Sequence, residues 1–257
     1  MSGMVAIIKK EIKTYFYSPL AYVLIGIFLF LMGIIFTKFV VIYQQMSMAQ
    51  RFGQSQSITL DKLASYFYQN MAFILCFLTP FMTMRLFAEE KNQSTMELLL
   101  TAPIKTGHLV LGKFLGALGV VGLMLLLSGV YAGFMILWGN PEIAVIASTY
   151  LGLVLAFCCY ISLGGFISAL SPSQAIAAVF TFVILLLLWL LQSLGQGVTA
   201  SLGPIEIGPT LVYLSPLGHF NSFNEGLIQA KDLVYFLSFT GFMLFLTHRV
   251  VESNRWR

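Results

Sequence analysis

Six long apolar stretches constrain the fold of this sequence more than any other feature. A helix needs about 20 apolar residues to cross the hydrocarbon core of a bilayer. The stretches cover residues 20–42, 67–84, 109–138, 143–170, 175–194 and 233–250. Only 9% of the 257 residues are charged, whereas soluble domains carry about 25%. We therefore predict an all-α integral membrane protein, built as one transmembrane domain over residues 1–257, and exclude a disordered chain, a secreted disulfide scaffold or a nucleic-acid-binding module.

The positive charges predict how the spans are oriented. Cytoplasmic loops of membrane proteins are enriched in Lys and Arg. Placing the N-terminus inside puts ten of the 14 Lys and Arg residues on the cytoplasmic side and leaves Lys38, Arg51, Lys62 and Lys231 outside. We expect both termini to be cytoplasmic. Spans two to six carry almost no charge away from their ends, which argues against an ion-coupled carrier, because ion pathways use intramembrane charges.

Residues 4–17 form an amphipathic segment before the first span. Apolar side chains recur at helical spacing, while lysines project from the other side: Val5, Ile8, Ile12 and Tyr15 against Lys9, Lys10 and Lys13. This pattern is typical of a helix lying in the membrane interface, with its lysines near lipid head groups. A simple topogenic charge cluster would explain the lysines but leave the apolar stripe unexplained.

The segment over residues 85–108 is the longest polar stretch on the predicted cytoplasmic side. Ser94 and Glu97 stand three residues apart before an apolar run, which is the pattern of a capping box. A short helix should therefore begin at about Thr95 and end at Pro103. It would present Met96, Leu99 and Leu100 on one side. Those apolar side chains would either contact a partner protein or pack back onto the bilayer and the bundle, and the residues alone leave both options open.

Residues 107–113 match the first positions of a phosphate-binding loop by chance. The next position should be Ser or Thr to reach Mg²⁺, but it is Phe114, and no strand precedes the motif. The stretch is instead the start of a transmembrane helix, whose glycines Gly112 and Gly116 suit close helix packing. We predict no ATPase activity in this chain and no catalytic, cofactor-binding or metal-binding residues.

Residues 195–232, between spans five and six, are too apolar for a free loop and too interrupted for a span. Prolines break the stretch, and a polar group then follows: Pro216, His219, Phe220, Asn224, Glu225 and Gly226. A re-entrant or interfacial helical hairpin near the outer leaflet satisfies both features. A single histidine in such a place is more often a structural group than a ligand or a proton relay.

Three motifs resemble those of ABC-2 type transporter permeases. The first is the amphipathic N-terminal helix that ends in Ser18-Pro19. The second is Arg85-Leu-Phe-Ala-Glu-Glu90 followed by Thr95-Met-Glu-Leu-Leu-Leu-Thr-Ala-Pro103. The third is Leu214-Ser-Pro-Leu-Gly-His-Phe220 with Gly226 and Lys231 after it. The pattern is most similar to the gliding-motility-associated branch and covers nearly the whole chain.

The resemblance implies a non-catalytic permease subunit of an exporter in the bacterial inner membrane. Two permeases, as a second copy or a paralogue, would form the pathway, and two separate ABC ATPase subunits would bind ATP and Mg²⁺. The short helix would be the coupling helix that contacts the ATPase. Its residues would be Glu89, Glu90, Ser94, Thr95, Met96, Glu97, Leu99, Leu100, Thr101 and Pro103.

Relatives in that branch imply an auxiliary membrane protein with a large extracytoplasmic domain. An alternative function therefore stays open: a mechanical complex that transmits ATPase closure to such a partner without moving cargo. An ion-coupled secondary transporter is the third and weakest alternative, because the spans are poor in charge.

Overall fold

The computed structural model describes residues 2–51, 60–93, 105–139, 141–197, 201–202 and 205–253. Helices make up nearly all of this described chain. They are α1 (Ser2–Tyr17), α2 (Pro19–Arg51), α3 (Leu60–Thr83), α4 (Ala88–Asn92), α6 (Thr106–Gly139), α7 (Ile143–Leu170), α8 (Gln174–Gly197), α9 (Ile207–Leu214), α10 (Pro216–Asn224) and α11 (Ala230–Ser253). Two short antiparallel strands, β1 (Ser201–Leu202) and β2 (Ile205–Glu206), connect α8 to α9.

Six of the helical segments are long and apolar enough to cross a membrane, which confirms the expected number of spans. They are Pro19–Met48, Lys62–Asn92, Thr106–Gly139, Ile143–Leu170, Gln174–Gly195 and Ala230–Ser253. Helix α2, which forms the first span, continues past residue 42, where the apolar run ends. Residues 43–51 contain neither Gly nor Pro and are rich in the good helix formers Gln and Met.

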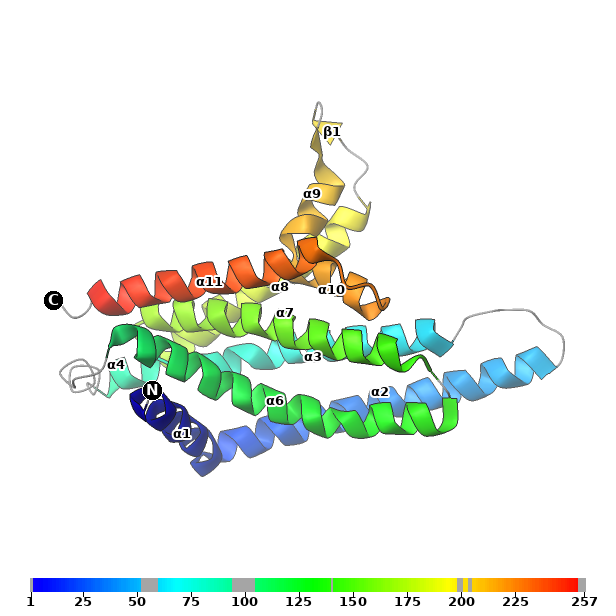
Figure 1. Cartoon of the computed structure of the whole chain (residues 1–257), viewed down its shortest axis with the longest axis horizontal. Coiled ribbons are helices and arrows are strands. Elements are labelled where there is room, and N and C mark those ends of the chain that lie inside the picture. The colour runs from blue at the N-terminus through cyan, green and yellow to red at the C-terminus, as the bar shows by residue number, and fades with distance from the viewer. Residues whose placement is uncertain are drawn as a thin grey trace.

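The bundle is organised around α7. This helix contacts α3, α6, α8, α10 and α11, and most of its side chains are buried. Figure 1 shows the long helices running side by side, with the N-terminus and the C-terminus at the same end of the bundle. Glycines on α7 allow its neighbours to approach closely, as at Gly164, where a Cβ atom would collide with Thr83 of α3. Small residues of this kind are the usual contacts between helices in lipid.

Helix α1 packs along the start of α6 rather than standing apart from the bundle. Its buried side chains are Ile7, Glu11 and Tyr15, one turn apart. This stripe differs from the one expected from the apolar pattern, because Val5 is 46% exposed and the carboxylate-bearing Glu11 takes a central position. The sequence pattern does not predict that Glu11 is buried, because a charged side chain is normally expected on the solvated face of an amphipathic helix.

The segment before the last span holds two consecutive short helices, α9 and α10, which contact each other. Helix α9 packs along α8, so the antiparallel pair is α8 with α9, joined through β1 and β2. Figure 1 shows α9 and the end of α8 standing away from the other helices, while the rest of α8 packs in the bundle against α3 and α7. Helix α10 instead packs into the bundle against α7, α8 and α3. Helix α9 therefore projects, whereas α10 is packed into the bundle.

Candidate functional site

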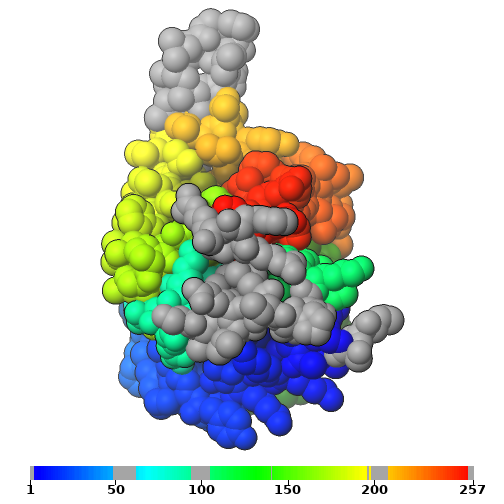
Figure 2. All heavy atoms as spheres, turned by 90° about the vertical axis from the view of Figure 1, so that its left-hand side faces the viewer, coloured from blue at the N-terminus to red at the C-terminus, as the bar shows by residue number. Residues whose placement is uncertain are grey.

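A group of polar side chains joins four helices at the end of the bundle that carries both termini. We call this group the terminal cluster: Glu11 of α1, Ser18 between α1 and α2, Arg85 before α4, Glu89 and Glu90 of α4, and Lys113 of α6. Figure 2 looks directly at this end, where α1, α4 and the last turns of α11 reach the surface.

Lys113 lies at the centre of the terminal cluster and is only 2% exposed. Its Nζ atom is 2.9 Å from Glu11 Oε1 and 2.8 Å from Glu90 Oε1, and it lies 5.4 Å from the centre of the Phe87 ring. A buried ammonium is stable only when it is paired and hydrogen-bonded. Two carboxylates from different helices supply that pairing, so Lys113 holds α1, α4 and α6 together.

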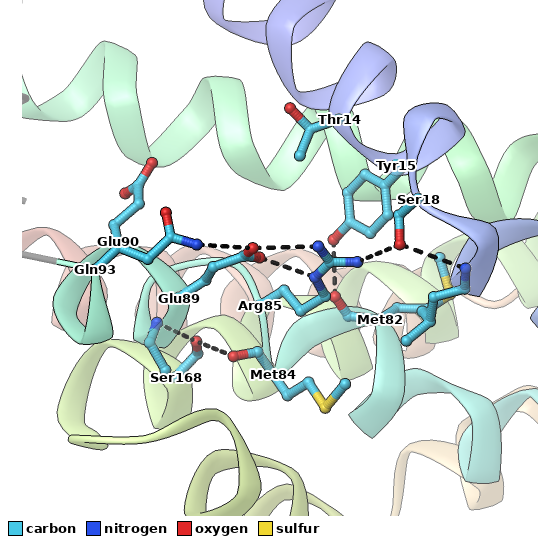
Figure 3. A network of polar contacts seen from close by, with 12 residues as sticks. Thr14, Tyr15, Ser18, Met82, Met84, Arg85, Glu89, Glu90, Gln93 and Ser168 are labelled. Carbon is cyan, nitrogen blue, oxygen red and sulfur yellow. Dashed lines mark hydrogen bonds and ion pairs between the residues drawn. The ribbon is translucent and has the colours of Figure 1, made fainter. Parts of the chain in front are cut away.

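Arg85 makes the second connection in the terminal cluster. Its Nε and Nη2 atoms donate to the two carboxylate oxygens of Glu89, at 2.8 and 3.2 Å, and its Nη1 donates to Ser18 Oγ at 2.7 Å. Figure 3 shows the guanidinium between Glu89 and Ser18. The planar guanidinium is suited to this two-pronged contact. As a result, the corner between α1 and α2 is fixed to the turn between α3 and α4.

Tyr15 reinforces the same corner. Its hydroxyl donates a hydrogen bond of 2.7 Å to the carbonyl oxygen of Met82, and its side chain is buried (Figure 3). Burial raises the pKa of the Tyr15 phenol well above its usual value, and the nearby Glu11 carboxylate raises it further. The hydroxyl therefore stays protonated and keeps donating to Met82.

The start of α4 is capped by a residue from a different helix. Phe87 occupies the N-cap position of α4 but offers no side-chain cap, because its side chain is a hydrocarbon. Ser168 of α7 takes this role: its Oγ accepts from the backbone N–H groups of Phe87 and Ala88, both at 3.1 Å, and donates to the Met84 carbonyl at 3.2 Å. Lys91 adds a hydrogen bond to the Ala169 carbonyl. Helix α4 is thus anchored on α7 at both ends (the Ser168 contacts are drawn in Figure 3).

Only two of the residues expected at the ATPase-coupling interface lie within the described chain. Glu89 and Glu90 are both committed to contacts inside the chain, with Arg85 and Lys113 respectively. The remaining eight lie outside the described residues, so their assignment stays a prediction: Ser94, Thr95, Met96, Glu97, Leu99, Leu100, Thr101 and Pro103. The terminal cluster joins α4 and α6, the described helices that precede and follow that segment in the chain.

Small residues on α6 bring α1 close enough for these contacts. A Cβ atom on Gly112 would lie 2.7 Å from Ile7 Cγ2, and one on Gly116 would lie 2.6 Å from Glu11 Cβ. The spacing of these glycines predicts helix packing but does not reveal α1 as their partner. Glu11, Lys113 and Ser168 are functional candidates that the sequence motifs do not reveal. The available signal was the position of Lys113 beside Gly112, inside an apolar run.

The polar residues expected near the outer leaflet surround α10, at some distance from the terminal cluster. His219 is buried, its Nδ1 lies 2.6 Å from Asp232 Oδ1, and its Nε2 lies 2.9 Å from the Tyr213 carbonyl. Its ring stacks on Tyr235 with the centroids 3.9 Å apart. Both ring nitrogens have partners, which agrees with a structural histidine. No sequence motif predicts Asp232 as the partner of His219.

The other members of that outer group stabilise the ends of α10. Pro216 is its first residue, and Phe220 is fully buried. Asn224 Nδ2 donates to the Ser65 carbonyl at 2.9 Å, while Ser65 Oγ donates to the Asn224 carbonyl at 3.0 Å. Glu225 is exposed, and Gly226 has a positive φ of 82°, a conformation that favours glycine. These residues fix the connection between α10 and α11.

Six apolar spans define a multi-pass helical membrane protein, and the terminal cluster joins α1, α4 and α6 at one end of it. The chain belongs to the ABC-2 family of transporters: the family model described as "ABC-2 family transporter protein" matches residues 5–251. Members of this family are non-catalytic membrane permease components of ABC transporters, which associate with ABC ATPase subunits. No curated protein matches the chain.

Proposed function

We propose that this chain is the permease subunit of an ATP-driven exporter in the bacterial inner membrane, with both termini in the cytoplasm. Two permeases form the pathway, and two ATPase subunits dock at the terminus-bearing end and hydrolyse ATP. Residues 94–104, which connect α4 to α6, are the contact with the ATPase. The family membership over residues 5–251 supports the permease assignment.

The observation that carries the coupling role is the Glu90–Lys113 contact of 2.8 Å. It joins the two helices on either side of residues 94–104, so a displacement of that segment moves α4 and α6 together. Glu11 extends the link to α1, and Ser168 extends it to α7. The terminal cluster therefore provides a direct path from an ATPase contact to the central helix of the bundle.

The test begins with isolation of the full chain from its host membrane together with any ATPase bound to it. ATPase activity of the complex in lipid nanodiscs is then compared for the wild type and the variants Glu97→Gln and Leu99→Ala. We expect both variants to bind less ATPase and to lower its turnover. Leu126→Ala is the matched control, because Leu126 is 77% exposed on the apolar surface of α6. Unchanged binding and turnover in the two coupling variants would refute the assignment.

A vesicle assay separates export from the mechanical alternative. Export predicts ATP-dependent movement of copurified small molecules or lipids across vesicles that contain the complete complex. A force-transmitting complex would hydrolyse ATP in the same vesicles without moving any of them.

A further inference from the structure

A cavity of about 310 Å³ lies where α9 meets the bundle, between the end of α8, α9, α10 and the start of α11. Helix α10 contacts the other three helices, so the cavity is bounded by elements that pack together. Figure 1 shows α9 rising beside α10 and the first turn of α11. The volume falls at the lower end of the range for small-molecule sites, about 300–1,000 Å³. The cavity is therefore large enough for a lipid head group or a molecule of similar size.

The cavity lies at the level of a lipid head group. Helix α11 has 24 residues, and at a rise of about 1.5 Å per residue it is about 36 Å long. It ends at the terminus-bearing end of the bundle (Figure 1), so its start and the cavity lie more than the thickness of the hydrocarbon core, about 30 Å, from that end. With the termini in the cytoplasm, as proposed above, the cavity faces the head groups of the outer leaflet.

Lys231 supplies a positive charge to this cavity. It lies in the first turn of α11, its side chain is exposed, and it forms no ion pair with any described residue. The neighbouring Asp232 is only 1% exposed, and its Oδ1 lies 2.6 Å from His219 Nδ1, so this carboxylate is paired within the protein. A lysine ammonium binds phosphate as a point charge. The exposed charge that the described lining offers a ligand is therefore positive.

Ser222 adds a hydrogen-bond donor from a second helix. Its side chain on α10 is half-buried, and its hydroxyl has no hydrogen-bond partner among the described residues. A hydroxyl carries one O–H donor, and an ammonium carries three N–H donors. A phosphodiester has two free oxygens, so a phosphate held between Lys231 and Ser222 would accept from both α11 and α10.

Helix α9 gives the cavity an apolar wall. Pro209, Val212 and the ring of Tyr213 line it, and Tyr213 is 58% exposed. A soluble phosphate ester would leave this surface in contact with water, whereas hydrocarbon attached to the phosphate would cover it. A net negative head group also suits the site better than a zwitterionic one, because a choline or ethanolamine cation would be repelled by Lys231.

We propose that this cavity binds the phosphodiester group of an anionic phospholipid, with the phosphate at Lys231 and Ser222 and the hydrocarbon against α9. The lipid would fill the space between the projecting helix and the bundle. The binding chemistry stands on the cavity alone, whereas its placement in the outer leaflet rests on the proposed orientation.

Native mass spectrometry of the full chain counts discrete bound lipids. The protein is delipidated in detergent, without ATPase, and titrated with phosphatidylglycerol, phosphatidylcholine and diacylglycerol of the same acyl chains, and with soluble glycerol phosphate. We expect one saturable phosphatidylglycerol adduct, with an affinity about fivefold above that for phosphatidylcholine. Diacylglycerol, which lacks the phosphate, and glycerol phosphate, which lacks the chains, should bind more weakly. Glycerol phosphate binding as tight as that of the lipid would overturn the lipid assignment and indicate a soluble phosphate ester.

Two variants test the cavity directly. Lys231→Met removes an exposed charge, where folding should be tolerant, and should weaken phosphatidylglycerol binding about fivefold. Lys62→Met is the matched control, because Lys62 is an exposed lysine in the first turn of α3 that does not line the cavity. Ser222→Phe fills the cavity while keeping Lys231 and should abolish the saturable adduct. Ser47→Phe adds the same ring at an exposed serine of α2 and should bind as before.

Size-exclusion profiles verify that every variant is folded. Equal weakening by Lys231→Met and Lys62→Met would indicate a general attraction of anions and would overturn the proposal. Unchanged binding in folded Ser222→Phe, or equal affinity for phosphatidylglycerol and phosphatidylcholine, would overturn it as well. Because ATPase is absent, this outcome is independent of the coupling test. Absence of the lipid adduct beside intact ATPase association would remove the lipid proposal alone, and lipid binding without ATPase association would remove the export proposal alone.

Discussion

Lys113 and Glu11 form a buried ion pair, with 2.9 Å between Nζ and Oε1, that joins the third apolar span to the N-terminal helix. Glu90 completes the arrangement from a third helix. Such a group contributes less through net attraction than through the cost of leaving any member unpaired. Helices α1, α4 and α6 therefore keep one relative arrangement, because moving any of them would leave a buried charge with fewer partners.

Replacing Lys113 tests that cost. Lys113→Met leaves the buried Glu11 carboxylate without its cation and removes the nearer cation of Glu90, so we expect the free energy of unfolding to fall by about 3–5 kcal/mol. Reversible unfolding in mixed micelles measures the change. Lys10→Met is the matched control, because Lys10 contacts Glu90 from 3.8 Å with a side chain that is 60% exposed. That variant should lose at most about 1 kcal/mol. Equal losses in both variants would contradict a central role for Lys113.

The close approach of α1 to α6 predicts a position-specific effect of adding one methyl group. Gly116→Ala places a Cβ atom 2.6 Å from Glu11 Cβ, so α1 must shift, and we expect a loss of about 1–3 kcal/mol. Gly129→Ala, on the same helix, meets nothing within 4 Å and should be neutral or stabilising by about 0.5–1 kcal/mol. Thermal unfolding in nanodiscs compares the two. If Gly129→Ala is as harmful as Gly116→Ala, the packing of α1 on α6 is not the cause.

The cap supplied by Ser168 predicts a local loss of protection. Ser168→Ala leaves the N–H groups of Phe87 and Ala88 without their acceptor, at a cost of about 1–3 kcal/mol. Hydrogen exchange of the peptide covering residues 84–93 should become faster, while the rest of α7 is unchanged. Ser162→Ala is the control, because Ser162 Oγ donates to the Cys159 carbonyl of its own helix. Similar exchange in both variants would argue against the cap.

The His219–Asp232 contact predicts an order among substitutions. His219 Nε2 lies 2.9 Å from the Tyr213 carbonyl oxygen, and Nδ1 lies 2.6 Å from Asp232 Oδ1, so both ring nitrogens are within hydrogen-bonding distance of a partner. Asp232→Asn can still donate from its amide to Nδ1 and should cost less than about 1 kcal/mol, whereas Asp232→Leu leaves Nδ1 unpaired and should cost about 1–3 kcal/mol. Thermal unfolding ranks the two variants, and a loss as large for Asp232→Asn as for Asp232→Leu would show that an amide cannot replace the carboxylate.

The membrane-spanning architecture was predictable from the sequence because lipid demands long uninterrupted apolar helices. Six spans follow from that demand alone, and the structure has six such helices. Their ends were less predictable. Helix α2 continues to Arg51 because polar residues that favour helix follow its apolar run without a break.

The polar contacts were much harder to predict, because they join residues that are distant in the chain. Glu11 stands among lysines and has the sequence context of a solvated side chain, yet its partner is 102 residues further on. Ser168 lies in a run of small residues typical of helix packing, which conceals its role as a cap for α4. Asp232 lies at the start of a span, where a charge is ordinarily explained by the membrane boundary. Sequence patterns report local environment, and these three residues depend on tertiary neighbours.

The seating of α1 on α6 has a consequence for biosynthesis. Glu11 leaves the ribosome 102 residues before Lys113, and at about 5–20 residues per second the delay is about 5–20 s. During that interval two apolar spans are already available for insertion, while the N-terminal helix has no docking surface. Helix α1 can therefore pack only after the third span has been synthesised. A ribosome that stalls before Lys113 leaves a nascent chain whose α1 lacks the helix against which it packs.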